Sequence, residues 1–599
     1  ISAQVEAEVA ALGVTTQRVA GSDRAETAAL ASAEAETGPE AFIVNGHRPA
    51  DALVAGAVAA RAGAALLLVD ADGIPASTDG PLQGIQKATI VGGFSVVSAQ
   101  VEEALRARIP DVTRLSGPDR SETAASVART LRAESTVHVV SGADPSLVDA
   151  IAAGWLAARP GGGPVLYSDV HEPGRGTDRY LRLGGLAATP AIRLVGGDAI
   201  LSAALVDELE VRLDEAEAGG PASQTRAIWV HLFDGSLKSR EGIARVLDTA
   251  AEHNLNTVIA QVARRHDSYY TSDVLPRTPD PAMPADLDLL AELIPQARAR
   301  GLEVQAWFAI APVYRAGAYG QMPPGHVYNT HGPDSGESWM TYARVVRDGE
   351  ETFEPSSEYM DVGVPGFRDH VVAMIEEVAQ RYDVDAVHLD YARYPEGGNW
   401  GYNPQARAQW QAEGSPDFSD WRRAQTEKLA KAIKQAVTAA RPGTHVTMAA
   451  IAQGDGPAGV GGFQNTRAFA QTYQDWAGWL AREAVDAAYP MAYMREDDHA
   501  IWYDHWVQFA AELAPHEDVA VGQASFLNTV GQSLAQLSEA LTATDGVVLY
   551  SYQQDTKCPA GRTEGGSPCS PIEPQGSLLD ALLDGPFADP APARRAPAS

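Results

Sequence analysis

The feature of this chain that most restricts its fold is a series of short apolar runs that alternate with amphipathic helical stretches from residue 225 to residue 585. The apolar runs have the length of buried strands, and the stretches between them, such as 239–253, 286–300 and 420–440, have helical length and periodicity. Eight such units predict a (β/α)8 barrel, in which catalytic groups gather at the carboxyl ends of the strands. The expected strands are 227–233, 257–262, 304–309, 386–389, 446–451, 485–491, 519–523 and 547–550.

An open, doubly wound sheet is the alternative, because it shows the same alternation of strands and helices. Such a sheet commonly has a Gly-rich nucleotide fingerprint after its first strand, and none follows residues 227–233 here. The C-terminal part is therefore predicted to be a closed (β/α)8 (TIM) barrel.

The N-terminal part contains an internal repeat of about one hundred residues. Arg18-Val-Ala-Gly-Ser-Asp-Arg-Ala-Glu-Thr-Ala28 returns as Arg114-Leu-Ser-Gly-Pro-Asp-Arg-Ser-Glu-Thr-Ala124, and Ile90-Val-Gly-Gly93 returns as Leu194-Val-Gly-Gly197. Within each copy, apolar runs alternate with Ala-rich helical stretches, a pattern typical of a small α/β unit with a parallel sheet. We assign one repeat to residues 13–111 and another to residues 112–212.

The remaining segments are assigned from composition and from the repeat. Ile1-Ser-Ala-Gln-Val-Glu6 matches Val97-Ser-Ala-Gln-Val-Glu102, the closing helix of a repeat, so residues 1–12 are expected to be the tail of a truncated repeat. On this interpretation, the rest of that repeat and a secretion signal precede residue 1. Residues 213–224 are acidic and then rich in Gly, Pro and Ser, which predicts a linker. Residues 586–599 are predicted to be a disordered tail, after a barrel that spans 225–585.

Charge and cysteine usage narrow the possible partners. The chain has 46 basic and 78 acidic residues and a net charge of −32, which disfavours nucleic acid as a partner. It lacks an uninterrupted apolar run of about 18 residues, so no membrane span is predicted. Cys558 and Cys569 share one Gly/Pro/Ser-rich loop and predict a disulfide in an oxidising compartment, with two free thiols as the alternative. Neither a metal nor a cofactor is predicted, since no further His or Cys near His266 and Asp267 completes a ligand set.

Polar and aromatic side chains collect at the predicted strand ends. Aromatic rings stack on the apolar faces of sugars, while carboxylates, guanidinium groups and amides bind the hydroxyl groups. The pattern predicts a carbohydrate site with Asp390 at its centre, because this carboxyl ends a strand beside Arg393. The other residues expected at the site are Asp234, Arg264, Asp267, Trp307, His388, Tyr394, Asn403, Tyr489, Tyr493, Gln523 and Tyr552.

The repeats resemble the type 2 cell-wall-binding repeats of Gram-positive surface proteins, on the Gly-x-Asp-Arg-x-Glu-Thr-Ala box and the Val-Gly-Gly segment. In that family three tandem repeats hold anionic secondary wall polymers without a covalent bond. Here two complete repeats are present. Arg24 and Arg120 occupy equivalent loops and are expected either to bind anionic sugars or phosphates or to bridge within their own loops.

The C-terminal part resembles the glycosyl-hydrolase-like family 10 over nearly all of residues 225–585. The motifs are Gln261-Val-Ala-Arg-Arg-His-Asp-Ser-Tyr-Tyr-Thr-Ser272, Asp361-Val-Gly-Val-Pro-Gly-Phe-Arg-Asp369, His388-Leu-Asp-Tyr-Ala-Arg-Tyr-Pro395 and Pro490-Met-Ala-Tyr493. The resemblance implies a (β/α)8 glycoside hydrolase whose substrates are cell-wall glycans, peptidoglycan strands above all. Together with the resemblance of the repeats, it implies a secreted protein at the cell wall of a Gram-positive bacterium.

Glycoside hydrolysis usually needs two carboxyl groups, one protonated and one ionised. Asp390 is predicted to be the ionised member, because Arg393 beside it would lower its pKa. Asp267 is predicted as the second carboxylate, with Asp234, Asp455 and Glu496 as alternatives. The rival hypothesis is a non-catalytic surface protein or adhesin that binds glycans with the same barrel.

Overall fold

The computed structural model describes residues 2–117, 119–131, 134–143, 147–159, 161–182, 186–217, 223–313, 322–514, 518–544, 546–554, 563–564, 567–568 and 577–592. They fall into two compact units, Ile1–Gly220 and Pro221–Ser599, each with hydrophobic cores of its own. Cys558 and Cys569, with their predicted disulfide, lie outside the described residues.

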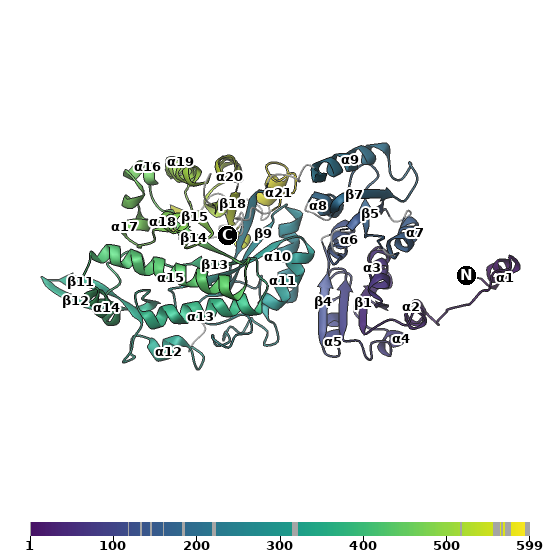
Figure 1. Ribbon diagram of the computed structural model, residues 1–599, viewed down its shortest axis with the longest axis horizontal. Coiled ribbons are helices and arrows are strands. Elements are labelled where there is room, and N and C mark those ends of the chain that lie inside the picture. The colour runs from purple at the N-terminus through teal and green to yellow at the C-terminus, as the bar shows by residue number, and fades with distance from the viewer. Residues whose placement is uncertain are drawn as a thin grey trace. The chain divides into compact units, whose positions relative to one another are not determined.

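The first unit contains two small parallel sheets with the same strand arrangement (Figure 1). In each sheet the first strand of the repeat lies between the next two, in the orders β2-β1-β3-β4 and β6-β5-β7. The strands are β1 (Glu40–Asn45), β2 (Ala65–Val69), β3 (Lys87–Val91), β4 (Asp111–Leu115), β5 (Glu134–Ser141), β6 (Val165–Ser168) and β7 (Leu186–Leu194). The helices are α1 (Ala3–Ala11), α2 (Arg24–Glu34), α3 (Pro49–Ala62), α4 (Ala76–Asp79), α5 (Ala99–Arg106), α6 (Arg120–Ala128), α7 (Val148–Ala157), α8 (Arg175–Arg182) and α9 (Ala203–Glu217).

The repeated Asp-Arg box starts a helix in both copies. Asp23 caps α2 and Asp119 caps α6, and each carboxylate accepts the backbone N–H of the Glu three residues later. A side-chain oxygen at this position satisfies one of the unpaired donors of the first turn and typically stabilises a helix by about 1 kcal/mol. The predicted α/β repeats are therefore confirmed, and the motif that reveals them has a structural cause.

Eight parallel strands close into the predicted barrel in the second unit. Their order is β14-β13-β10-β9-β8-β18-β17-β15, and a pairing between β14 and β15 closes the ring. The strands are β8 (Thr225–Val230), β9 (Thr257–Ala263), β10 (Glu303–Ala309), β13 (Ala386–Asp390), β14 (His445–Ile451), β15 (Ala487–Met491), β17 (Val521–Ala524) and β18 (Gly546–Tyr550); β16 (Asp518–Val519) extends the edge beside β15. All eight predicted strands are present, with boundaries that shift by at most three residues.

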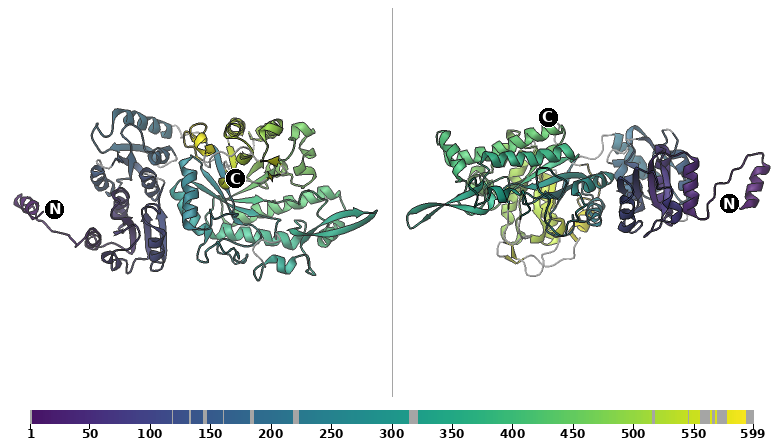
Figure 2. Two further views of the ribbon diagram at one scale, coloured as in Figure 1. Left: turned by 180° about the vertical axis from the view of Figure 1, so that it is seen from behind. Right: turned by 90° about the horizontal axis from the view of Figure 1, so that it is seen from below.

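Helices surround these strands (Figures 1 and 2). They are α10 (Arg240–Glu252), α11 (Leu289–Ala299), α13 (Pro365–Arg381), α15 (Phe418–Ala440), α18 (Trp476–Ala481), α19 (Glu496–Leu513), α20 (Val530–Thr544) and α21 (Ser577–Leu583). Shorter helices lie in the connections: α12 (Val327–His331), α14 (Pro404–Ala412), α16 (Pro457–Val460) and α17 (Arg467–Ala470). Among the described residues, no helix has both the length and the apolar character that a membrane crossing requires.

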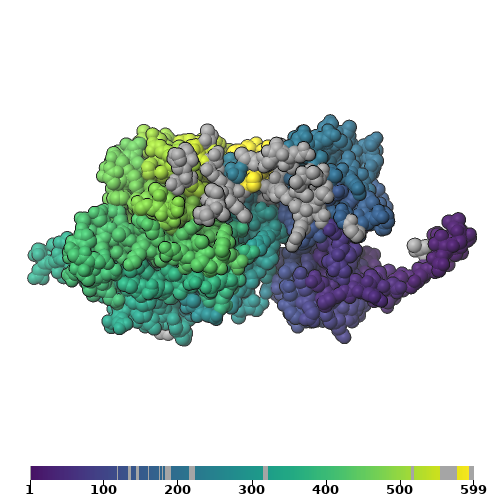
Figure 3. Space-filling view, in the orientation of Figure 1, coloured from purple at the N-terminus to yellow at the C-terminus, as the bar shows by residue number. Residues whose placement is uncertain are grey.

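The acidic insertion after the third barrel strand forms an antiparallel hairpin of β11 (Met340–Arg347) and β12 (Glu350–Met360). Its tip projects from the barrel in both ribbon views and in the space-filling view (Figures 1, 2 and 3). Its base returns to the barrel, where Met360 N–H donates to the carbonyl of Ala311 just past β10. The hairpin therefore brings the end of β12 to the carboxyl edge of the barrel.

Two predicted boundaries need correction. The helix α9 runs to Glu217, so residues 213–217 of the predicted linker are helical. Residues 586–592 of the predicted disordered tail pack on the barrel: Phe587 is fully buried, and Arg226 Nη1 donates to the carbonyl of Asp589 at 2.6 Å. Backbone carbonyls bound by barrel side chains hold this Pro- and Ala-rich segment, which composition does not reveal.

Candidate active site

Asp390 is the last residue of β13 and lies at the carboxyl edge of the barrel with 6% exposure. Its Oδ2 accepts the indole N–H of Trp307 from the neighbouring strand β10 at 3.1 Å. Its Oδ1 accepts the backbone N–H of Tyr391 at 2.7 Å. Tyr391 has a φ of 54°, in the left-handed region that non-glycine residues seldom adopt and that clusters at functional sites.

The pKa of Asp390 differs from the prediction. Burial raises the pKa of Asp390 to about 6, although Arg393 and the two hydrogen bonds act in the opposite direction. Arg393 lowers the pKa of Asp390 as predicted, but the loss of solvation raises it by more. The prediction of a carboxylate with a lowered pKa is therefore wrong, and a substantial fraction of Asp390 is protonated near pH 6.

Arg393 joins Asp390 to a second carboxylate. It is 7% exposed, its guanidinium lies 4.7 Å from the Tyr391 ring centroid, and its Nη1 is 3.1 Å from Glu396 Oε1. The Glu396 side chain is 37% exposed and also accepts the amide N–H of Gln453. A buried acid, a cation and a more exposed carboxylate thus follow one another within seven residues of sequence.

The base of the hairpin adds residues to this group. Tyr359, at the end of β12, has its ring centroid 6.3 Å from that of Tyr391. Burial raises the pKa of Tyr359; Arg393 acts in the opposite direction, and the carboxylates Glu358, Asp390 and Glu396 raise this pKa further. Glu358 and Tyr359 therefore lie near Asp390, although they belong to the insertion.

Aromatic rings occupy the region next to the first and last strands. Trp229 lies in the barrel interior, with Tyr493 6.3 Å and Tyr550 6.0 Å away between ring centroids. Tyr493 is half-buried, and Tyr552, also half-buried, packs against the core. The exposed Asp234 follows β8, the strand of Trp229, and the half-buried Arg264 follows the neighbouring strand β9.

Asp267 occupies a different environment from Asp390. Its side chain is fully buried, and Oδ2 accepts bonds from Arg265 Nη2 at 2.9 Å and from Thr278 Oγ1 at 2.6 Å. These contacts enclose Asp267 and hold the loop after β9. This placement gives no support to the prediction of Asp267 as the second catalytic carboxylate, which stays untested.

Three further predicted substrate ligands are buried structural residues. Asn403 caps α14, and its amide donates to the carbonyls of Ser338 and Met340 at 2.8 Å. Gln523 donates to Ser533 and Gln536, and Tyr394 packs edge-on against Tyr473. Of the alternative carboxylates, Asp455 is paired with His505, and Glu496 accepts a bond from Gln536.

His388 and Tyr489 belong to a hydrogen-bond chain inside the barrel. The indole of Trp229 can only donate, so His388 Nε2 accepts its N–H at 3.1 Å. The ring hydrogen of His388 is then on Nδ1, which donates a hydrogen bond to Thr447. Thr447 then donates to Gln305, which donates to the Tyr489 hydroxyl at 3.0 Å. Burial lowers the pKa of His388 to about 3, so this imidazole is neutral and serves the interior rather than a substrate.

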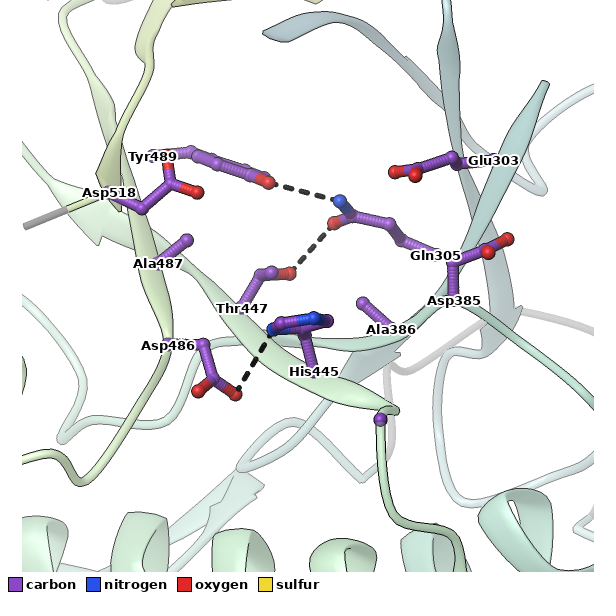
Figure 4. A pocket seen from close by; sticks show the side chains of 11 residues that line it. Glu303, Gln305, Asp385, Ala386, His445, Thr447, Asp486, Ala487, Tyr489 and Asp518 are labelled. Atoms are coloured by element: carbon purple, nitrogen blue, oxygen red, sulfur yellow. Dashed lines mark hydrogen bonds and ion pairs between the residues drawn. The ribbon is translucent and has the colours of Figure 1, made fainter. Parts of the chain in front are cut away.

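This chain ends at a pocket on the opposite side of the barrel from Asp390 (Figure 4). Gln305 and Tyr489 point toward each other across it, and Glu303, Asp385, Asp486 and Asp518 surround it. These residues lie at the amino ends of the strands, where conserved barrel features serve stability rather than catalysis. The pocket is therefore not the catalytic site.

A cluster of histidines lies near the loop after β9. His266 Nδ1 is 3.0 Å from His370 Nε2, and His326 and His331 lie close enough to influence the pKa of His370. Sequence alone did not suggest this cluster, since the four residues are up to 104 positions apart. Within the described ranges, no three His, Cys, Asp or Glu side chains are arranged to hold a metal ion.

In the repeats, Arg24 and Arg120 make equivalent contacts. Arg24 Nη1 donates to the carbonyl of Gly46 at 2.6 Å, and Arg120 Nη1 donates to that of Gly142. Each guanidinium thus braces the loop after a central strand. Arg24 remains exposed and Arg120 half-buried, so the bracing role does not prevent either from contacting a ligand.

The structure therefore brings together Asp390, Trp307 and Arg393 of the predicted site. The residues near Asp390 that the sequence did not predict are Glu358, Tyr359, Tyr391 and Glu396, and farther from Asp390 it also missed Phe233. Phe233 was assigned to the first strand, but β8 ends at Val230, which leaves Phe233 in the following loop. Tyr359 and Glu358 arrive from an insertion, for which the barrel pattern provides no position.

Comparisons with known proteins agree with this division of the chain. Residues 224–514 match the family model of glycosyl hydrolase-like 10, and residues 18–102 and 114–206 each match cell wall binding domain 2. The chain is 26% identical over 330 residues to glycosyl hydrolase YngK of Bacillus subtilis, covering 51% of this chain and 61% of that protein. It is 24% identical over 317 residues to glycosyl hydrolase DigH of Escherichia coli K12, covering 49% of this chain and 68% of that protein.

The repeats have a separate relative. Over 162 residues the chain is 33% identical to N-acetylmuramoyl-L-alanine amidase LytC of Bacillus subtilis, covering 26% of this chain and 32% of the amidase. The chain spans about three fifths of YngK and a third of LytC, so each similarity concerns a part of these proteins. The protein thus combines two repeats that match cell wall binding domain 2 with a (β/α)8 barrel whose residues 224–514 match the glycosyl hydrolase-like 10 family.

Proposed function

We propose that this protein is a secreted glycoside hydrolase that cleaves cell-wall glycan, with peptidoglycan strands as its substrate, while its repeats hold it at the wall. The observation that carries the proposal is Asp390, a buried carboxyl with a pKa of about 6 at the carboxyl edge of a glycosyl hydrolase-like barrel. A carboxyl group with such a pKa can give up a proton at near-neutral pH, as a general acid in glycoside cleavage must.

In this mechanism Asp390 donates its proton to the glycosidic oxygen as the bond to the anomeric carbon breaks. The positive charge that develops on the sugar needs an ionised carboxylate. Glu396 is our candidate, because Arg393 contacts it directly and it is more exposed than Asp390. Water adds to the anomeric carbon, and the proton that it loses goes to a carboxylate, which restores the charge balance.

The second carboxylate can be tested separately from the acid. We expect Glu396→Gln to lower kcat by about 100-fold or more, within the range found when an acid–base group is removed. Glu358→Gln, on the base of the hairpin, is the matched comparison and should lower kcat less than tenfold. The opposite order would assign the role to Glu358.

The repeats supply the proposed attachment to the wall. Tethering an enzyme raises the local concentration of a polymer that it binds weakly. Two exposed or half-buried arginines at the equivalent first positions of α2 and α6 suit an anionic secondary wall polymer. We propose a location at the wall surface of a Gram-positive bacterium on the same basis, supported by the match to cell wall binding domain 2.

The experiment that tests the substrate uses peptidoglycan in two forms. The full chain is incubated with peptide-bearing and with peptide-free peptidoglycan, and soluble products are identified by mass spectrometry. Sugar fragments with a new reducing end support the proposal, and their end groups identify the bond that is cleaved. Bound glycan without any soluble product would instead indicate a glycan-binding surface protein.

A further inference from the structure

Phe233 differs from the other large apolar side chains of the barrel unit. Its ring is 53% exposed, and among the described residues of this unit it shares such exposure with Val346 and Ile501, neither of which is aromatic. It follows β8 by three residues, on the edge of the barrel that also carries Asp390. The ring packs against the His231 ring, with 4.4 Å between centroids, and still leaves about half of its surface in water, where a ligand can reach it.

The loop holds Phe233 in this outward position. The backbone N–H of Phe233 donates to His231 Nδ1 at 3.2 Å, and the N–H of Leu232 donates to Gln261 Oε1 at 3.1 Å. Gln553, after the last strand, donates to the carbonyl of His231 at 2.9 Å. Hydrogen bonds thus connect the loop to β9 and to the segment after β18, and they hold the Phe233 ring in its exposed position.

The charged neighbours of the ring suit a sugar. The guanidinium carbon of Arg264 lies 4.1 Å from the centroid of the Phe233 ring and supports it. The next residue, Asp234, is exposed, and its carboxylate accepts the N–H of Ser236 at 2.9 Å. An aromatic surface that can stack on a pyranose, next to a carboxylate that can accept hydroxyl protons, is the usual composition of a carbohydrate subsite.

The distance from Asp390 determines what such a subsite would do. The strands β8 and β13 are separated by β9 and β10, and three strand spacings of about 4.8 Å amount to roughly 14 Å along the sheet. A sugar on Phe233 is therefore not the sugar whose bond Asp390 would cleave. Resting on the proposed function, we infer that Phe233, with Arg264 and Asp234, forms a remote subsite that binds a further sugar of the glycan chain.

The test compares substrates of different length. We expect Phe233→Ala to lower kcat/KM for a hexasaccharide from peptide-free peptidoglycan by about tenfold, equivalent to about 1.4 kcal/mol. For a disaccharide fragment with a chromogenic leaving group, the same substitution should change kcat/KM by less than twofold. Phe233→Trp should retain activity on the hexasaccharide, and Ile501→Ala, which removes an equally exposed apolar side chain elsewhere, should change neither value.

Equal losses on the long and short substrates, or no loss on the hexasaccharide, would overturn the subsite. If the unmodified enzyme cleaves neither substrate, the proposed function has failed and binding decides the inference. Calorimetry with the hexasaccharide then compares Asp390→Asn with the double variant that also carries Phe233→Ala. A tenfold weaker affinity in the double variant supports the subsite, and equal affinities overturn it.

Discussion

For a single residue, the site depends on two opposed effects on Asp390. Burial favours the protonated form, while Arg393, Trp307 and the Tyr391 amide favour the charged form. The sequence could predict Asp390 and Arg393 as neighbours, because a strand ends between them. It could not predict which effect dominates, since burial depends on β10 and the hairpin, which come from other parts of the chain.

The pH dependence of activity follows from this balance. As a general acid with a pKa of about 6, Asp390 loses its proton as the pH rises. We expect kcat/KM for a soluble glycan to fall above about pH 6. Arg393→Gln removes a cation that lowers the pKa of Asp390, so the fall should move to higher pH even though the maximal rate decreases. A profile that rises through pH 6, or does not shift in the variant, contradicts the assignment.

At the scale of secondary-structure elements, several motif residues that suggested substrate binding instead fix loops. Asn403 caps α14 and ties it to β11, Asp267 closes the loop after β9, and Gln523 connects β17 to α20. All three follow strands or precede helices in the sequence, as site residues do. What distinguishes them is full burial with hydrogen-bond partners inside the protein, two of them on other elements, which periodicity cannot report.

Asn403→Ala separates the structural role from a binding role. The substitution removes a helix cap and the donor to the carbonyls of Ser338 and Met340, the second of which is buried, so we expect the free energy of unfolding to fall by about 2–4 kcal/mol. KM measured on the folded fraction should remain unchanged. Chemical denaturation and steady-state kinetics provide the two readouts, with Gln405→Ala on the exposed first turn of α14 as the control. A raised KM with unchanged stability would restore Asn403 as a substrate ligand.

The histidine cluster makes the barrel unit sensitive to acid. Burial lowers the pKa of His370 to about 4, and the pKa values of His266 and His326 are also lowered. Because the folded pKa values lie below the unfolded value of about 6.5, the stabilisation is complete above pH 6.5 and is lost as the pH falls.

His370→Gln should reduce this loss. Between pH 6.5 and pH 5.0, the imidazole of His370 takes up a proton in the unfolded state but stays neutral in the folded state. This difference lowers the free energy of unfolding by about 2 kcal/mol. The stability difference between pH 7.5 and pH 5.0, measured by chemical denaturation, should therefore be about 2 kcal/mol smaller in the variant. His253→Gln, on a histidine that directly follows α10 and pairs with the exposed Asp580, serves as the control. An unchanged difference for His370→Gln would contradict the buried cluster.

For the whole molecule, the sequence predicted two α/β repeats, a boundary near residue 220 and a barrel, because each depends on a periodic pattern. It could not predict the path of the β11–β12 hairpin or the packing of residues 586–592. Both depend on contacts with distant segments: Arg226, for example, reaches Asp589 across 363 positions. The contributions of Glu358 and Tyr359 to the site escaped prediction for the same reason.

Separate cores in the two units predict separate functions. A chain of residues 221–599 should fold by itself and hydrolyse a soluble hexasaccharide with kcat/KM within about twofold of the full chain, since each unit buries its own apolar surface. Co-sedimentation with purified cell walls should fall at least tenfold once the repeats are removed. Undiminished sedimentation would assign wall attachment to the barrel and not to the repeats.

The central claim is that Asp390 is the proton donor of a glycoside hydrolase. The most direct measurement is the initial rate at which peptide-free peptidoglycan releases reducing ends, compared between the unmodified protein and Asp390→Asn. Removal of a general acid typically costs between about 100-fold and 10,000-fold in rate, so we predict a loss of at least 100-fold with glycan binding retained. Equal rates in the two proteins, or no release by either, would contradict the account.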